Sequence, residues 1–174
     1  MRYLVFAIER LTNVSGWLSG WLVFLMMALV LFEVFMRYVL NQPPMIADEF
    51  SSYMLVAISL LGLAYAWKEG GHIRISIWAK RLPPRVSSWL RLTGLVLAFA
   101  FTSELTHASY SFIALSFKLH LHSATWLHFP LQGPQMTIPI GLGLLSLTLL
   151  LAIVRAIKNI RAGVSIELTA EEKV

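Results

Sequence analysis

Four long apolar stretches divide the chain, at about residues 14–36, 48–67, 88–112 and 135–154. Each is close to the roughly 20 residues that a helix needs to cross a hydrocarbon layer about 30 Å thick. In lipid, every backbone N–H and C=O group must be satisfied within the protein, so such stretches form helices or a closed barrel. Continuous apolar runs without strict alternation favour helices. The sequence therefore predicts an all-α integral membrane protein with four transmembrane helices.

Basic residues are distributed unevenly among the connections between these stretches. Twelve of the 14 Lys and Arg residues lie in the N-terminal arm, in the connection between the second and third stretches, or in the C-terminal tail. Arg37 and Lys118 are the two exceptions. Short cytoplasmic loops are enriched in Lys and Arg, so this asymmetry predicts orientation as well as the number of spans. We therefore expect both termini to lie in the cytoplasm.

The composition excludes an ordinary soluble enzyme. The chain is 57% hydrophobic and 13% charged, about half the charged fraction of a typical soluble domain. Its net charge of +5 comes from residues beside the apolar stretches, which favours anionic lipid headgroups over nucleic acid as the partner. The absence of cysteine excludes disulfides and thiolate metal sites. No small-residue cleavage pattern follows the first stretch, so we expect a retained span.

Two amphipathic segments flank the predicted spans on the cytoplasmic side. Residues 1–13 carry apolar residues at i, i+3, i+4 and i+7, a pattern typical of a helix lying in the membrane interface. Residues 73–82 predict a second interfacial helix, which ends at Pro83-Pro84. A four-helix membrane domain then covers residues 14–156, and a cytoplasmic tail covers residues 157–174. The predicted anchors at the inner boundary are tryptophans and cations: Trp17, Trp67, Trp78, Lys80, Arg81, Arg85 and Trp89.

Charged residues gather near the predicted outer boundary. Arg37 and Glu49 flank a turn that contains Pro43-Pro44, and Glu33 lies one helical turn before Arg37. Pairing lowers the cost of placing charges close to lipid. We expect Arg37 and Glu49 to hold the first two spans in order, with contact to a partner subunit as the alternative. A proton relay is disfavoured because no chain of acids crosses the membrane.

One acid and several histidines could carry chemistry. Glu104 and His107 share a helix face in the third stretch, which predicts contact between helices ahead of transport chemistry. The outer loop holds His120, His122 and His128, but too few other ligands accompany them to favour a metal site. Haem held by two histidines is disfavoured because only His107 lies within a span. We therefore expect neither a cofactor nor a metal.

Several short motifs occur in a characteristic order within residues 14–91. They are the run Phe35-Met-Arg-Tyr-Val-Leu-Asn-Gln-Pro43, then Glu49, Tyr53, Leu61-Gly62, Ala66, Gly71-His72-Ile73-Arg74-Ile75 and Leu82-Pro83. In this order and spacing they resemble the small permease subunit of tripartite ATP-independent periplasmic (TRAP) transporters, the DctQ-like family. Two positions depart from the family pattern: Ser76 stands where an aspartate is usual, and Met45-Ile46-Ala47 where a tryptophan is frequent.

The resemblance implies a role in a three-part transporter of the bacterial inner membrane. A periplasmic binding protein captures an organic anion, either a carboxylate or a sugar acid such as sialic acid, and a large permease subunit moves it inward on a sodium gradient. The small subunit is implied to form a stable heterodimer with the large one and to offer residues 38–47 and 118–134 to the binding protein. It is implied to have no catalytic and no substrate-binding residues. The implied structural or interface residues are Arg37, Glu49, Tyr53, Gly62, His72 and Arg74.

The residues themselves agree with a scaffold. The sequence shows no pair of broken helices, no inverted repeat and no midplane cluster of polar groups, which a self-sufficient transporter needs. Two alternatives stay open. One is a membrane anchor subunit of a respiratory enzyme, with haem or quinone near His107. The other is a small independent transporter.

Overall fold

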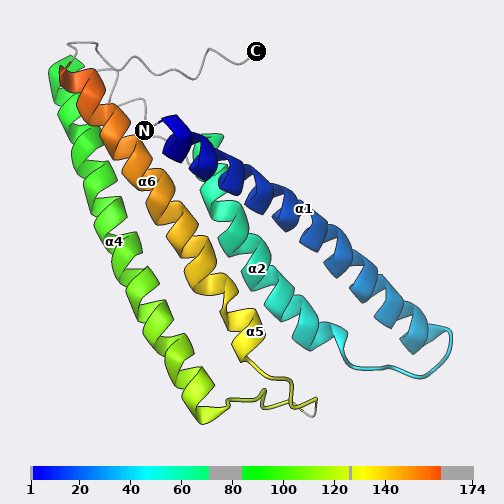
Figure 1. Cartoon of the computed structure of the whole chain (residues 1–174). Coiled ribbons are helices and arrows are strands. Elements are labelled where there is room, and N and C mark those ends of the chain that lie inside the picture. Colours follow the sequence, from blue (N-terminus) through cyan, green and yellow to red (C-terminus); the bar gives the residue numbers. More distant parts are fainter. Residues whose placement is uncertain (1, 71–83, 126, 162–174) are drawn as a thin grey trace.

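The computed structural model describes residues 2–70, 84–125 and 127–161 (Figure 1). Its helices are α1 (Arg2–Tyr38), α2 (Ala47–Lys68), α4 (Pro84–Leu119), α5 (Gln132–Gln135) and α6 (Thr137–Arg161). Four segments are long and apolar enough to cross a membrane: Val5–Tyr38, Ala47–Lys68, Val86–Leu119 and Gln132–Ile160. Within the described residues, extended pairing is limited to one bridge between His122 and Pro130. The prediction of an all-α protein with four transmembrane helices is confirmed.

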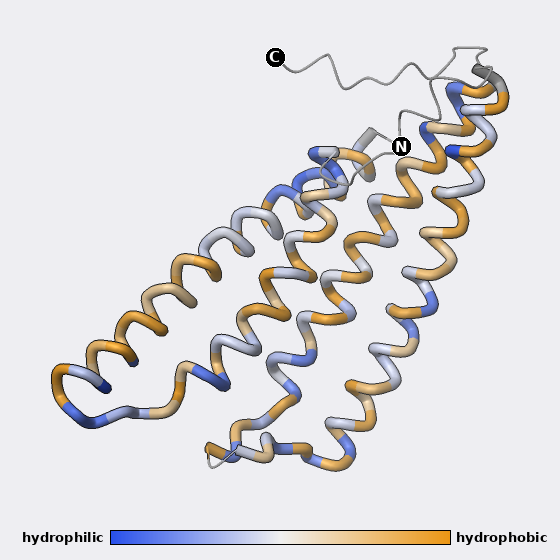
Figure 2. Tube along the Cα trace, turned by 180° about the vertical axis from the view of Figure 1, so that it is seen from behind, coloured by the Kyte–Doolittle hydropathy of each residue, from blue (hydrophilic) through white to orange (hydrophobic). Residues whose placement is uncertain are grey.

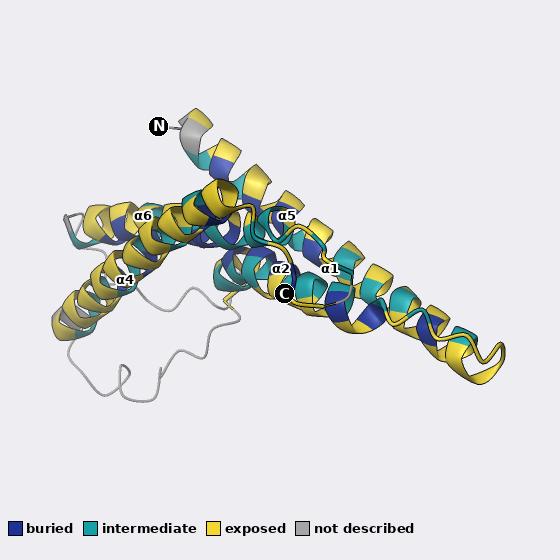
Figure 3. Cartoon of the chain, turned by 90° about the horizontal axis from the view of Figure 1, so that it is seen from below, coloured by how far each residue is buried: buried dark blue, intermediate teal, exposed yellow. Residues whose placement is uncertain are grey.

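The four long helices form an open row rather than a closed bundle. α1 packs against α2, α2 packs against α6, and α6 packs against α4, with a smaller contact between α1 and α6 (Figure 1). The ends of the row are therefore α1 and α4. Figure 3 shows the elongated outline and the many exposed residues on these two end helices. Each of them presents a face that the described part of the chain leaves uncovered.

Small and polar residues mark the sides by which the helices pack. The buried positions of α1 recur every three or four residues: Ile8, Thr12, Ser15 and Ser19. The buried positions of α6 do the same: Leu142, Leu145, Leu149, Ile153 and Ala156. Many large apolar side chains elsewhere on the helices are exposed, and hydrophobic residues predominate along much of the helices (Figure 2). This distribution is expected where lipid, and not water, surrounds the helices, because lipid does not drive apolar residues inward.

The segment expected to form an interfacial helix at residues 1–13 is continuous with the first apolar stretch from Arg2 onward. α1 runs without a break from Arg2 to Tyr38. No proline interrupts the segment, and the Thr12 hydroxyl donates to the carbonyl of Ile8 at 2.8 Å, within the helix. The buried stripe that begins at Ile8 continues through Ser15 and Ser19. Residues 2–13 are therefore the first turns of α1, and the side of the helix that is buried at Ile8 stays buried as far as Ser19.

The other helices are longer than predicted. α4 continues to Leu119 instead of ending near residue 112, and α6 continues to Arg161, so residues 157–161, expected in the tail, are helical. The short helix α5 precedes α6 on the outer side. The interfacial helix expected at residues 73–82 and the tail after residue 161 lie outside the described residues.

Candidate functional site

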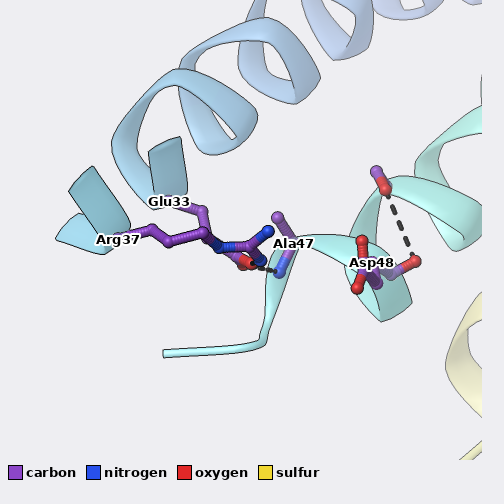
Figure 4. A network of polar contacts seen from close by, with 5 residues as sticks. Glu33, Arg37, Ala47 and Asp48 are labelled. Atoms are coloured by element: carbon purple, nitrogen blue, oxygen red, sulfur yellow. Dashed lines mark hydrogen bonds and ion pairs between the residues drawn. The ribbon is translucent and has the colours of Figure 1, made fainter. Parts of the chain in front are cut away.

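The carboxylate of Glu33 closes the turn between α1 and α2. Its Oε2 accepts a hydrogen bond at 2.6 Å from the backbone N–H of Ala47, the first residue of α2. Ile46, at the N-cap position, provides no side-chain hydrogen bond, so a residue of the neighbouring helix caps α2 (Figure 4). Glu33 is only 3% exposed. A carboxylate this buried requires hydrogen-bond donors, and the cap supplies one of them.

Arg37 supplies the second donor to Glu33. Its Nη2 lies 2.6 Å from Oε1 of Glu33, one turn earlier on α1. Glu49, the expected partner in ordering the two spans, makes no ion pair with Arg37. The Arg37 side chain is 48% exposed, so it contacts the buried Glu33 carboxylate from the protein surface and holds it in the orientation that caps α2. The contact between spans is made by Glu33, which the sequence identified only as a neighbour of Arg37.

Glu49 instead joins α2 to the outer loop between α4 and α5. The hydroxyl of Tyr53 donates to its Oε1 at 2.7 Å, and the hydroxyl of Thr125 donates to its Oε2. The Thr125 backbone N–H donates to the Ser123 hydroxyl at 3.1 Å, which stabilises the turn that presents Thr125. Glu49 is 7% exposed. Tyr53, expected at an interface, lies in this network, whereas no sequence signal had identified Ser123 or Thr125.

Aromatic side chains hold the same loop against α2. The rings of Phe50 and Phe129 have centroids 5.1 Å apart, and those of Tyr53 and Phe129 are 6.1 Å apart. Such edge and tilted arrangements are the preferred contacts of aromatic rings. The Ser123 N–H also donates to the carbonyl of Phe129 at 2.9 Å, closing the loop on itself. The outer loop is therefore docked on the first turns of α2 by polar and apolar contacts together.

The three loop histidines lie at turns and backbone contacts of the outer loop. Among the described residues, no group of three His, Asp or Glu could hold a metal ion. His120 and His128 have positive φ values of 48° and 46°, the left-handed region used in tight turns. Nδ1 of His128 lies 2.7 Å from the carbonyl oxygen of Thr125. His122 forms the bridge with Pro130.

Glycines set the closest approaches between helices. A Cβ on Gly62 would lie 3.0 Å from Oγ of Ser19, which donates to the carbonyl of Ile58 at 2.9 Å. Gly62 therefore lies at the contact between α1 and α2. A Cβ on Gly141 would lie 2.6 Å from the backbone carbonyl of Leu60, so α6 and α2 are closer still.

Polar contacts also join the helices on the side of the row that is predicted to face the cytoplasm. Nη2 of Arg155 on α6 lies 2.6 Å from Oε1 of Glu9 on α1. Nζ of Lys68 on α2 donates to Oδ1 of Asn13. These groups are partly or fully exposed, so each contact contributes less than a buried one. Together they connect the N-terminal part of α1 to α6 and α2.

Glu104 and His107 lie on the uncovered side of α4. Both residues are exposed. Within the described residues, neither side chain has a hydrogen bond or an ion pair. The contact between helices that their spacing predicts is therefore not made inside this part of the chain. The structure places them at an end of the row, where another protein can reach them.

The remaining predicted residues concern membrane anchoring. Trp17 is 74% exposed and Trp89 is 60% exposed, whereas Trp67 packs against the buried cluster between α2, α4 and α6. Arg85 is the second residue of α4, and its side chain is not described. The predicted residues that lie outside the described part are His72, Arg74, Trp78, Lys80 and Arg81.

Comparison with known proteins gives two matches. The family model "Tripartite ATP-independent periplasmic transporters, DctQ component" matches residues 26–159, well over half of the chain. A protein of Haemophilus influenzae that bears the name TRAP transporter small permease protein, itself an inferred assignment, is 33% identical over 60 residues. That alignment covers 34% of this chain and 37% of the relative. The family match begins within α1 and ends within α6, so it includes both outer networks.

Proposed function

This chain belongs to the family of DctQ components of TRAP transporters, and we propose that it is the stationary brace beside the moving carrier of such a transporter. As a TRAP small permease it is a transport component and not an enzyme. A brace in this sense is a subunit that stays fixed in the bilayer and gives a moving partner a surface to work against. The proposal concerns which part of the transport cycle this subunit performs.

The observation that carries the proposal is the open row of unbroken helices. α1, α2, α4 and α6 each run continuously through the span. Secondary transporters commonly hold substrate and coupling ions at the ends of discontinuous helices near the bilayer midplane. Within the described residues, no long helix is interrupted at that depth. Broad uncovered faces suit a subunit that packs along a larger partner.

The partners and the transported solute that we propose are those implied by the family resemblance. The large permease subunit forms a stable heterodimer with this chain in the bacterial inner membrane. It moves an organic anion, a carboxylate or a sugar acid, on a sodium gradient. A periplasmic binding protein delivers the anion. The small subunit has no contact with the anion in this scheme, which is consistent with its apolar spans.

The outer loops contribute to docking of the binding protein. Residues 38–47 and 118–134 lie at the same end of the helices, and the networks of Glu33 and Glu49 hold them. A preorganised loop loses less conformational entropy on binding than a free one. The docking role is supported by the contacts that hold both loops against α2.

Residues on the predicted cytoplasmic side anchor the subunit in the membrane. Arg74 and Arg81 lie in the most basic connection of the chain, and cations and tryptophans at the interface resist vertical displacement. Substitution of both arginines by glutamate is expected to lower transport at unchanged solute binding by the periplasmic component. Uptake by the double variant at the unmodified rate would contradict the anchoring role.

Reconstitution tests the proposed function as a whole. Proteoliposomes with an inward sodium gradient would contain this chain, the large permease subunit, or both, with the binding protein added outside. Uptake of the organic anion is expected only when all three proteins are present. Uptake by vesicles that hold this chain alone would overturn the proposal. A Soret absorption band from the purified chain would support the respiratory-anchor alternative instead.

A further inference from the structure

Glu104 lies near the centre of a membrane span without a partner in the described chain. It is close to the middle of the apolar segment Val86–Leu119 on α4. Its side chain is exposed, and the described residues give it neither a hydrogen bond nor an ion pair. Ionisable groups at this depth are costly in lipid and face the interior of an assembly or a water-filled cavity. The open row provides no such interior on this side of α4.

The packing of α4 against its neighbours indicates a depth for Glu104 near the middle of the apolar segments. Leu95 packs in the same buried cluster as Ala64 of α2. Nine residues along α4, at 1.5 Å per residue, place Glu104 about 14 Å farther toward the outer side. Nine residues from Ala64 toward the outer end of α2 is Leu55, which lies near the middle of Ala47–Lys68. α2 has 22 residues, enough to span the hydrocarbon once.

The residues around Glu104 have the composition of a contact between membrane helices. On α4, Leu95, Thr102 and Ile113 are buried and face α6. The exposed residues on the opposite side of the helix include five small or polar ones, Ala100, Glu104, His107, Ala108 and Ser111, here called the α4 face, beside the large apolar Leu97 and Leu115. Small residues let a second helix approach closely, and polar ones hydrogen-bond across the contact. Lipid alone would not require this combination.

The other end of the row has a different composition. The side of α1 that points away from α2 carries large apolar residues and one alanine: Trp17, Trp21, Phe24, Ala28, Phe32 and Phe35. From Trp17 to Phe35 this side has no ionisable group, and the exposed Arg10 on the same side lies near the N-terminal end of the helix. Lipid covers the apolar part at no cost. The two end helices therefore differ near the middle of the span, where α4 has an ionisable group without a described partner and this side of α1 has none.

We propose that the α4 face is the intramembrane docking surface for one transmembrane helix of the large permease subunit, which places a basic side chain against Glu104. The inference rests on the proposed function and adds the location of the contact. A second copy of this chain fits the surface less well. A two-fold axis along the membrane normal would place two copies of Glu104 at the same depth, with like charges opposed.

Site-directed photo-cross-linking in the assembled transporter tests the location. A photoreactive amino acid replaces Ala108 on the α4 face or, as a control, Leu25 on α1. Leu25 is 49% exposed and lies eight residues inward of Glu33, which contacts the outer end of α2, so its depth matches that of Leu55 and Glu104. Cross-links to the large subunit are expected from position 108 and not from position 25. The reverse pattern would overturn the inference, and so would cross-links from 108 to a second copy or to lipid only.

Co-purification tests the charge. Glu104→Leu removes the carboxylate without making the span less apolar, so membrane insertion is retained. Recovery of the large subunit with this variant is expected to fall about tenfold, the effect of losing one or two interhelical polar contacts. Leu105→Ala, on the adjacent residue outside the α4 face, is the control and is expected to keep full recovery.

Different results would overturn the docking surface and the proposed function. Full recovery with Glu104→Leu, while the unmodified chain still co-purifies with the large subunit, would overturn the docking surface and leave the proposed function standing. Failure of the unmodified chain to co-purify with any large permease subunit would overturn the proposed function itself.

Discussion

Two buried carboxylates at the outer end of the molecule each join segments that are distant in the sequence. Glu33 is bonded to a backbone N–H and a guanidinium, and Glu49 is bonded to the hydroxyls of Tyr53 and Thr125. A buried carboxylate is stable only if donors replace its lost hydration. Its neighbours must therefore stay in place, which makes each of these side chains a fastening point for the loop that supplies the donors.

Removal of the Glu33 carboxylate should loosen the start of α2. Glu33→Ala leaves the Ala47 N–H uncapped and Arg37 unpaired, and we expect a loss of about 1–2 kcal/mol of stability, since Arg37 is half exposed. The melting midpoint in detergent should fall by several degrees. Asp48→Ala is the matched control, because Asp48 is exposed in the first turn of the same helix and should change the midpoint far less. Equal midpoints for both variants would contradict the capping role.

Loss of one hydroxyl should free the outer loop. Thr125→Val keeps the size of the side chain but removes the donor to Glu49, a contact worth about 1 kcal/mol. Hydrogen–deuterium exchange of the loop amides, among them Ser123 and His128, should accelerate about fivefold, the factor that corresponds to 1 kcal/mol. Thr93→Val is the control, since Thr93 donates only to the Trp89 carbonyl of its own helix. Unchanged loop exchange in the Thr125 variant would show that the aromatic contacts suffice.

At the scale of elements, α6 is the helix on which the row depends. It packs against α2 on one side and α4 on the other, and it also touches α1. Its most buried large residue, Leu149, is 2% exposed and belongs to the cluster with Ala64 and Leu95. Where Gly141 meets Leu60, the absence of a side chain lets the two backbones come together. Such close approach is how membrane helices gain van der Waals contact.

A single methyl group should separate α6 from α2. Gly141→Ala would place its Cβ 2.6 Å from the Leu60 backbone, which cannot move aside as a flexible side chain can. We expect destabilisation of about 1–3 kcal/mol, measured as a lower melting midpoint. Gly143→Ala is the control on the same helix, because nothing lies within 4 Å of its Cβ. That variant should be neutral or slightly more stable, and a stable Gly141 variant would show that the contact is looser than described.

At the scale of the whole molecule, the open row explains why this small protein has so much apolar surface. In a closed bundle the helices would bury each other, whereas here most large apolar residues of α1 and α4 are exposed (Figures 2 and 3). Lipid accounts for the apolar part of that surface, and the proposed large subunit accounts for the polar part of α4. The two outer loops lie at one end of the helices, and the start of α1 and the end of α6 lie at the other (Figure 1).

Orientation in the membrane can be tested directly because the chain contains no cysteine. Single cysteines at Asn41 and Ala124, both exposed in the outer loops, should react with a membrane-impermeant maleimide added to intact spheroplasts. A cysteine at Glu69, which is exposed just after α2, should react only after the membrane is opened. Labelling of position 69 in intact spheroplasts would reverse the predicted topology.

Span number, helix class and family could all be predicted from the sequence. The length of an apolar run is a local property, and a run of that length in a bilayer must form a helix because its backbone groups have no water to bond. The motifs from Phe35 to Pro83 also lie along the chain itself, and the family match confirms what they indicated. The amphipathic pattern of residues 1–13 did not indicate that the helix continues without a break into the first apolar stretch, which the structure shows.

Which residues meet across the row was decided only by the tertiary structure. Arg37 pairs with Glu33 and not with Glu49, Glu49 meets Thr125 across 76 positions, and Gly141 touches Leu60. These contacts depend on the order of the helices and on how each is rotated about its axis, which spacing along one helix does not determine. For the same reason the sequence identified Glu104 as a residue in need of a partner, but only the row of helices showed that it faces away from the rest of the chain.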